Sequence, residues 1–212
     1  MRRPVRYREL NLIRSEYARR RREIANRLAQ FAAVPHSEYY YELAYCLMTP
    51  QSSAAHAGKV VERLRQEGFQ ARGFNPAPIL ARRDHYIRFH NTKARRLLEA
   101  RDAMEAIDIR LSAGGEPAEM RAWLVDHVKG LGWKEASHFL RNVGYRGLAI
   151  LDRHILKNLR HHRVISVLPG ALTAPRYMAI EEKFRRFAGE IDIPMDELDL
   201  LFWSRETGEI LK

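Results

Sequence analysis

The sequence predicts an all-α protein, and three observations support this fold class. Apolar residues recur at helical spacing along almost the whole chain of 212 residues. Glycine, proline and capping residues interrupt this pattern at intervals that suit helix ends. No stretch longer than a few residues alternates between apolar and polar side chains, so no strand is predicted. We expect about nine helices.

The first predicted helix covers residues 8–32 and is strongly basic. Its candidate buried stripe consists of Leu10, Leu12, Ile13, Tyr17, Ile24, Leu28 and Phe31. Ser37 is expected to cap the second helix, because a serine hydroxyl can accept a hydrogen bond from a backbone N–H of the first turn. Thr49-Pro50 ends that helix, since the residue before a proline avoids the helical conformation.

Ser52 or Ser53 is expected to cap the third helix, which runs to about Gln66 and is closed by Gly68. A loop rich in glycine, asparagine and proline follows, with a short segment near residues 79–83. The remaining helices are expected at residues 91–107, 118–128, 133–143, 152–161, 173–191 and 195–205. Turns between them are marked by Gly114, Gly115, Gly144, Pro169 and Gly170.

The chain is long enough for one domain or two small ones, and no long linker interrupts it. We therefore expect a single unit, residues 1–212, built from two closely packed helical subdomains. The middle helices, approximately residues 52–160, form one of them. Residues 1–51 and 161–212 pack together as the other.

Basic residues outnumber acidic residues, since 37 Lys and Arg against 26 Asp and Glu give a formal net charge of +11. This excess favours a polyanionic partner, because a basic surface attracts phosphate backbones over long range. Ribosomal and membrane-surface proteins share the property, so charge alone does not identify the partner.

Cys46 is the only cysteine, so this chain cannot form an intrachain disulfide or a four-thiolate zinc or iron–sulfur site. Its apolar helical surroundings favour a core position. No run approaches the roughly 20 apolar residues of a membrane span, and the basic N-terminus lacks the apolar stretch of a secretory signal. No histidine pair combines ligand spacing with acidic neighbours. We expect a soluble intracellular protein without a metal or another cofactor.

The most informative segment is Val128-Lys129-Gly130-Leu131-Gly132-Trp133-Lys134, between two predicted helices. Glycines at Gly130 and Gly132 allow a tight turn whose backbone N–H groups can approach an anion, and the following helix N-terminus adds partial positive charge. Such a helix–hairpin–helix holds a DNA phosphate without reading sequence. The alternative is an ordinary turn between helices that requires glycine.

Lys134 and Asp152 add chemistry that a phosphate clamp does not need. A neutral lysine amine is a nucleophile that can form a Schiff base. Asp152 precedes the next predicted helix, where an aspartate side chain caps the N-terminus and stays ionised, so it can face a developing cation. A surface lysine and a purely structural cap are the alternatives.

Several separated motifs then indicate a family. Residues 129–142 (KGLGWKEASHFLRN) and 149–154 (AILDRH) closely resemble the helix–hairpin–helix DNA glycosylases, in particular the archaeal-type 8-oxoguanine DNA glycosylase/AP lyases. The segments TPQS (49–52), RFHNTKA (88–94) and TGEILK (207–212) resemble the same group. The chain lacks the cysteine cluster of the iron–sulfur branch, and its loop from Gly144 to Ile150 contains no proline.

The resemblance implies an active site in the cleft between the two subdomains. It assigns the nucleophile to Lys134, which attacks the sugar C1′ of a flipped nucleotide, and the catalytic carboxylate to Asp152. β-Elimination then cleaves the strand. The implied partner is double-stranded DNA containing 8-oxoguanine, and we expect a monomer in the cytoplasm, at the nucleoid of a prokaryote.

Five further residues receive roles from the resemblance. Gln51 fills the gap left by the flipped base, Phe89 wedges beside the orphaned partner base, and His154 binds phosphate. Trp203 stacks on the extruded base. The carboxylate of Lys212, the last residue, accepts a hydrogen bond from N7–H of 8-oxoguanine. Each has a structural alternative: a helix-boundary glutamine, core aromatic residues, an exposed histidine and a frayed chain end.

Two other functions stay open at this level. A non-catalytic helix–hairpin–helix module would bind DNA without needing Lys134 or Asp152. A glycosylase for another oxidised base, such as an oxidised pyrimidine, would keep both residues and change the lesion.

Overall fold

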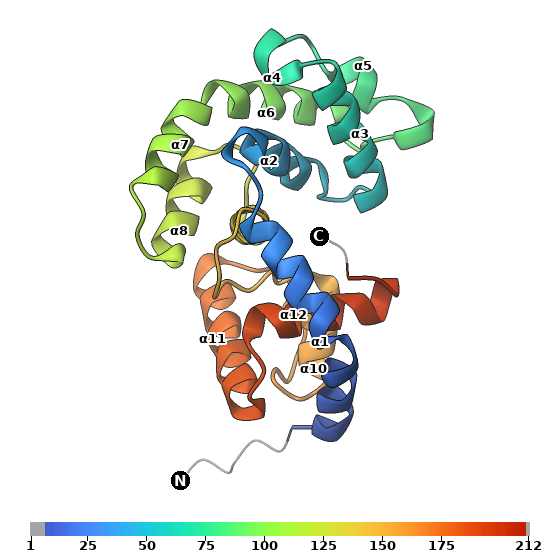
Figure 1. The fold of residues 1–212 in the computed structure, drawn as a ribbon, viewed down its shortest axis with the longest axis vertical. Coiled ribbons are helices and arrows are strands. Elements are labelled where there is room, and N and C mark those ends of the chain that lie inside the picture. The colour runs from blue at the N-terminus through green and yellow to red at the C-terminus, as the bar shows by residue number, and fades with distance from the viewer. Residues whose placement is uncertain (1–6, 211–212) are drawn as a thin grey trace. The chain divides into compact units, whose positions relative to one another are not determined.

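The structure is a computed structural model that describes residues 7–210. Every regular element in this range is a helix, which confirms the all-α class (Figure 1). The described residues form twelve α-helices and two short 3₁₀ helices. No helix among them has both the length and the apolar composition that crossing a lipid bilayer requires.

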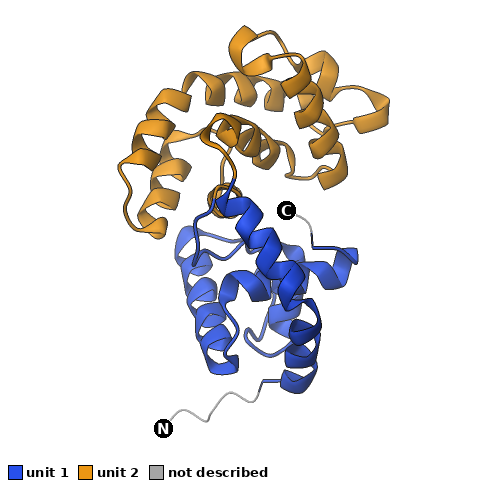
Figure 2. Ribbon diagram, viewed as in Figure 1, with its two compact units in different colours: residues 1–33, 144–212 blue, residues 34–143 orange. Residues whose placement is uncertain are grey.

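The described chain divides into two compact units (Figure 2). Residues 34–143 form one unit, and residues 7–33 together with 144–210 form the other. These boundaries differ from the expected 52–160. Residues 34–51 belong to the middle unit because their helix packs against other helices of that unit, and residues 144–160 join the other unit because their helix packs on the last helix of the chain.

The middle unit surrounds α2 (Tyr39–Met48), whose residues from Tyr40 to Met48 are all buried. The other helices of this unit are α3 (Ala54–Gln66), α4 (Phe69–Arg72), α5 (Ala77–Leu80), α6 (His90–Asp102), α7 (Met104–Ser112), α8 (Pro117–His127) and α9 (Trp133–Asn142), with 3₁₀ helices η1 (His36–Glu38) and η2 (Arg83–His85). Helices α3, α6 and α9 pack against α2, and α8 packs against α9. This packing places α9 against the buried helix α2.

The second unit is organised around α12 (Met195–Thr207). Helix α12 packs against α1 (Leu10–Ala32), α10 (Arg153–His161) and α11 (Ala174–Ile191). Its core includes stacked aromatic rings, among them Phe184 and Phe202 with centroids 6.1 Å apart. Helix α12 therefore contacts both α10 and the N-terminal helix α1.

Local chemistry explains many of the helix ends. The hydroxyl of Ser53 accepts a hydrogen bond from the backbone of His56 at 3.4 Å, so Ser53 rather than Ser52 caps α3. Ser37 does not cap α2, because it lies inside η1 and the helix follows directly. Of the expected stripe on α1, Ile13, Ile24, Leu28 and Phe31 are buried, whereas Leu12 is 46% exposed.

The predicted helix at 91–107 is two helices, because the chain turns at Ala103 between α6 and α7. No glycine or proline marks this break in the sequence. The short helix α4 lies within the segment expected to be a loop, and α5 overlaps the short segment expected near residues 79–83. Each contributes one buried residue, Phe69 and Leu80. Each of these helices has only four residues and buries a single apolar side chain. So short a segment contains no repeating apolar pattern from which a helix could be predicted.

Candidate active site

The hairpin between α8 and α9 forms as the sequence predicts. The N–H of Leu131 donates to the carbonyl of Val128 at 3.1 Å, and the N–H of Ala136 donates to the carbonyl of Gly132 at 2.9 Å, which begins α9. Apolar residues of the two helices and of the hairpin between them are buried: Leu124, Val128, Leu131, Ala136, Phe139 and Leu140.

The two hairpin glycines differ in backbone conformation and surroundings. Gly130 has φ of +100°, a conformation that side-chain-bearing residues rarely adopt, and a Cβ there would lie 3.3 Å from side-chain atoms of Arg96 and Leu47. Gly132 has an extended backbone that any residue can adopt. A Cβ on Gly132 would lie 3.0 Å from Oε2 of Glu135, so this glycine allows a close approach.

The first turn of α9 is anchored by Arg121 of α8, which is 1% exposed. Its guanidinium lies 5.1 Å from the ring centroid of Trp133, and its Nη1 donates to the hydroxyl of Ser137 at 3.1 Å. The Ser137 hydroxyl donates in turn to the carbonyl of Trp133 at 2.9 Å. These contacts fix the backbone that carries Lys134.

Lys134 is the second residue of α9, and 26% of its side chain is exposed. Its Nζ lies 3.0 Å from Oε1 of Glu135, a carboxylate that is itself only 15% exposed. Both charges act on a third group, Lys93 of α6. Burial lowers the pKa of Lys93 to about 8, with Glu135 raising it and Lys134 lowering it.

Gln51 and Phe89 occupy two neighbouring turns of the same unit. Gln51 is exposed at φ of +55°, and Phe89 is 51% exposed at φ of +60°, where it precedes α6. The hydroxyl of Ser52 accepts a hydrogen bond from the backbone N–H of Arg88 at 3.0 Å, which ties the turns together. The Arg88 guanidinium lies 4.9 Å from the Phe89 ring centroid.

Asp152 caps α10, as expected. One of its carboxylate oxygens accepts hydrogen bonds from the backbone of His154 and of Ile155, both at 2.8 Å. Within residues 7–210 the other oxygen accepts no hydrogen bond. The capped carboxylate therefore retains an oxygen that can face a cation.

Buried side chains of α11 and α12 hold the loop that leads to Asp152. The backbone N–H of Gly147 donates to Asp196 at 3.0 Å, and that of Ala149 donates to Glu181 at 2.8 Å. Tyr177 donates to the carbonyl of Ala149 at 2.6 Å and accepts from the N–H of Leu151 at 3.2 Å. The loop thus obtains from side chains the hydrogen bonds that helices obtain internally.

Sequence analysis missed these loop-binding acids, as well as Glu135 and Lys93. A signal existed for Glu181, because it lies on the apolar stripe of α11 together with Tyr177 and Phe184. Asp196 carried none, because acidic residues are common in the first turn of a helix. Lys93 and Glu135 carried no such signal, since charged residues are ordinary in the first turns of a helix.

The remaining predicted residues lie on the second unit or beyond the described range. His154 Nδ1 lies 3.5 Å from Oε2 of Glu206, and its Nε2 accepts from Nε of Arg153 at 3.0 Å. Trp203 is partly exposed on α12. Lys212 lies outside the described residues. The structure thus groups Gln51, Phe89, Gly130, Gly132 and Lys134 in the middle unit, and Asp152, His154 and Trp203 in the other.

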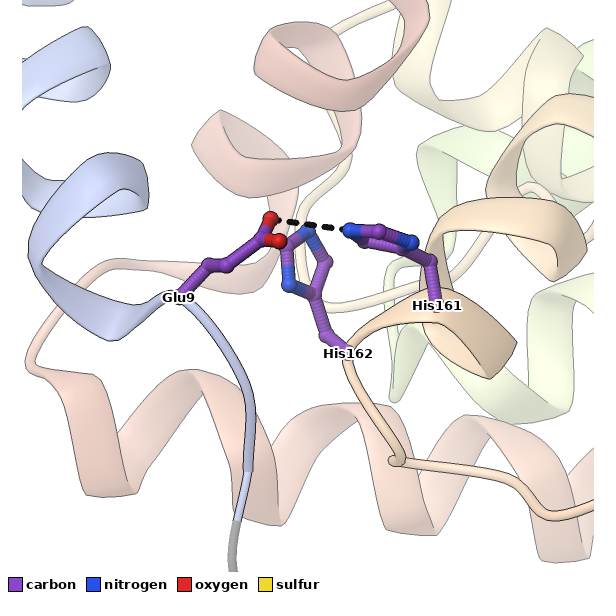
Figure 3. A group of neighbouring side chains, drawn as sticks. All are labelled: Glu9, His161 and His162. Carbon is purple, nitrogen blue, oxygen red and sulfur yellow. Dashed lines mark hydrogen bonds and ion pairs between the residues drawn. The ribbon is translucent and has the colours of Figure 1, made fainter.

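One group within residues 7–210 has the composition of a metal site: Glu9, His161 and His162 (Figure 3). Glu9 pairs with His161 at 2.8 Å. Nη1 of Arg205 lies 2.7 Å from Nε2 of His162 and can only donate, so Nδ1 carries the proton and donates to the Arg8 carbonyl at 3.0 Å. Both nitrogens of His162 are therefore engaged, one by a cation, and the group fits a structural contact rather than a metal site.

Comparison with known proteins identifies relatives along most of the chain. The family model described as 8-oxoguanine DNA glycosylase matches residues 24–193. The 8-oxoguanine DNA glycosylase/AP lyase of Fusobacterium nucleatum is 41% identical over 181 residues, which are 82% of each chain. That of Korarchaeum cryptofilum is 34% identical over 203 residues, which are 95% of this chain and 96% of the relative.

Solved structures similar to this chain come from the same kind of protein as its sequence relatives. The crystal structure of the Methanocaldococcus jannaschii 8-oxoguanine DNA glycosylase has a TM-score of 0.83 and 31% identity, covering 96% of this chain and 97% of that one. The same enzyme in complex with a 15mer DNA containing 8-oxoguanine has a TM-score of 0.82 and 30% identity, covering 95% and 99%.

Proposed function

The chain belongs to the 8-oxoguanine DNA glycosylase family, and from this membership we propose that it excises 8-oxoguanine from double-stranded DNA and cleaves the strand at the resulting abasic site. The relatives carry both activities in their names. The single observation that supports a lysine-based mechanism is the partly exposed Lys134 on the first turn of α9, directly after the hairpin.

Lys134 acts as the nucleophile. Its neutral amine attacks C1′ of the flipped nucleotide, the N-glycosidic bond breaks, and the base leaves with the bonding electron pair and acquires a proton. Loss of the amine proton and opening of the sugar ring give an imine between Nζ and C1′. Removal of a proton from C2′ then expels the 3′ phosphate, and hydrolysis of the imine releases the enzyme.

Asp152 stabilises the positive charge that develops on the sugar as the base departs. Two backbone N–H groups hold one carboxylate oxygen in place at 2.8 Å, so the side chain does not have to reorganise during the reaction. This role requires that Asp152 and Lys134 both reach the same sugar in the DNA complex.

The hairpin and the two exposed turns of the middle unit bind the DNA. Backbone N–H groups around Gly130 and Gly132, with the N-terminus of α9, hold a phosphate. Gln51 fills the gap left by the flipped nucleotide, and the exposed ring of Phe89 wedges beside the orphaned base. In the other unit, His154 contacts a phosphate and Trp203 stacks on the extruded base.

Borohydride trapping tests the mechanism, because reduction of the imine links protein and DNA covalently. We expect the unmodified protein to be trapped on 8-oxoguanine duplex DNA, and Lys134→Gln to lose trapping while retaining duplex binding. Lys129→Gln is the matched control, since it removes an exposed lysine of the hairpin and should still be trapped. Trapping of Lys134→Gln would show that another residue is the nucleophile. Stronger trapping on an oxidised pyrimidine would change the assigned lesion.

A further inference from the structure

Lys93 is a buried cation that the proposed mechanism does not use. It lies in the first turn of α6 and is 7% exposed. Its Nζ donates to the carbonyl oxygens of Met48 and Pro50, both at 2.6 Å, and to the hydroxyl of Ser52 at 3.1 Å. All three acceptors belong to the turn that contains Gln51.

The number of donors matches the number of acceptors. An ammonium group has three N–H donors, and the three bonds to residues 48–52 use all of them. A neutral amine has only two donors, so deprotonation removes at least one bond. Because no donor remains for a phosphate, Lys93 acts within the protein rather than on the DNA.

The turn held by Lys93 has a conformation that needs support. Gln51 has φ of +55°, which is unfavourable for a residue with a side chain and persists where surrounding contacts enforce it. The carbonyl before Gln51 belongs to Pro50 and the hydroxyl after it belongs to Ser52, and Lys93 binds both. The N–H of Ser52 also donates to the carbonyl of Thr49 at 3.0 Å, which closes the turn.

The same lysine connects the Gln51 turn with the turn of Phe89. The Ser52 hydroxyl that receives a bond from Lys93 also accepts from the backbone N–H of Arg88 at 3.0 Å. The backbone N–H of Lys93 donates to the carbonyl of Phe89 at 3.0 Å. Both turns are thus held through one residue.

We propose that Lys93, as an ammonium ion, is a positioning residue that sets the backbone of the Gln51 turn for insertion into DNA. The role of Gln51 in filling the gap rests on the proposed function. The charged groups that act on Lys93 are Glu135 and Lys134 of α9, and burial holds the pKa of Lys93 at about 8. The three hydrogen bonds from Lys93 Nζ are therefore complete at neutral pH, and at least one of them is lost as the pH rises above about 8.

A double-mutant cycle on binding tests this role without depending on the chemistry of Lys134. The measurement is the Kd for a duplex with a tetrahydrofuran analogue of an abasic site, which presents a gap and has no base to remove. In the otherwise unmodified protein, we expect Lys93→Met to raise the Kd about tenfold. In a protein that already carries Gln51→Gly, the same substitution should raise the Kd less than about threefold. Glycine adopts the same φ without a side chain to insert. Equal losses in both backgrounds would overturn the proposal.

Two controls separate positioning from charge and from folding. Lys59→Met removes an exposed positive charge from α3 and should show no coupling to Gln51→Gly. Ser52→Ala removes one acceptor and keeps Lys93, so it stands in for Lys93→Met if that variant does not fold. Its loss should be smaller, and it should also be coupled to Gln51; an uncoupled loss contradicts the proposal.

The pH dependence provides an independent readout. Between about pH 7 and about pH 9.5, the ratio of Kd values for Lys93→Met and the unmodified protein should fall towards one, because only the unmodified protein loses the ammonium. Groups common to both proteins cancel in this ratio. A constant ratio would show that the ammonium is not needed. If trapping by Lys134 fails while the cycle shows coupling, the nucleophile assignment fails and the positioning role stands.

Discussion

One carboxylate oxygen of Asp152 lies 2.8 Å from the backbone nitrogen of Ile155, three residues along the chain. The same oxygen accepts from the N–H of His154. A helix cap and a group proposed to stabilise a cation are therefore the same side chain, and substitutions can separate the two roles.

Asp152→Asn keeps an oxygen that can accept the capping hydrogen bonds, whereas Asp152→Ala removes it. We expect the free energy of unfolding of the asparagine variant to lie within a few tenths of a kcal/mol of that of the unmodified protein. For the alanine variant we expect it to be lower by about 1 kcal/mol. Both should lose 8-oxoguanine excision by about 100-fold or more, because neither carries a charge. Thermal denaturation and single-turnover excision measure the two effects. Excision by Asp152→Asn within about threefold of normal would exclude the electrostatic role.

Gly130→Ala should disrupt the hairpin. A side chain at φ of +100° is strained, and its Cβ would press on Arg96 and Leu47 at 3.3 Å. We expect a loss of at least about 1 kcal/mol in the free energy of unfolding and weaker binding of undamaged duplex DNA. Gly58→Ala is the control, because Gly58 lies within α3 and a Cβ there meets nothing within 4 Å. That variant should be as stable as the unmodified protein or slightly more so.

Phe89→Ala should reduce excision without affecting the fold. Phe89 is 51% exposed, so removal of its ring should change the free energy of unfolding by less than about 0.5 kcal/mol. If it wedges into the duplex, excision at sub-saturating DNA should fall about tenfold, which corresponds to the loss of one stacking contact. Leu12→Ala removes a similarly exposed apolar side chain, 46% exposed on α1, and should leave excision unchanged. Equal behaviour of the two variants would remove the wedge from the mechanism.

Acid should weaken the second unit through His162. Burial lowers the pKa of this imidazole from 6.5, so the unfolded chain binds a proton at a higher pH than the folded protein does. Stability from this group is complete above pH 6.5 and is lost as the pH falls below it, by at most about 1.4 kcal/mol for each pH unit. Urea unfolding of the unmodified protein and of His162→Gln, at about pH 7.5 and about pH 5, measures the difference. An unchanged difference between the two proteins would contradict this linkage.

Local sequence patterns predicted most of the helices and several of their ends. Asp152 caps α10 as expected, and Gly130 provides the turn before α9. These features follow from residues within about four positions of one another, which is the range of helical hydrogen bonds and of capping.

Contacts between distant residues decided the rest. The break at Ala103 and the three bonds from Lys93 to residues 48–52 left no local pattern. Glu181 meets the N–H of Ala149 from 32 positions away, and Lys93 meets Met48 from 45 positions away. The sequence alone determined where helices form and which residue types can perform the chemistry. Only the folded chain decided which charges are buried and which partners satisfy them, since burial makes a polar group depend on neighbours that sequence spacing does not specify.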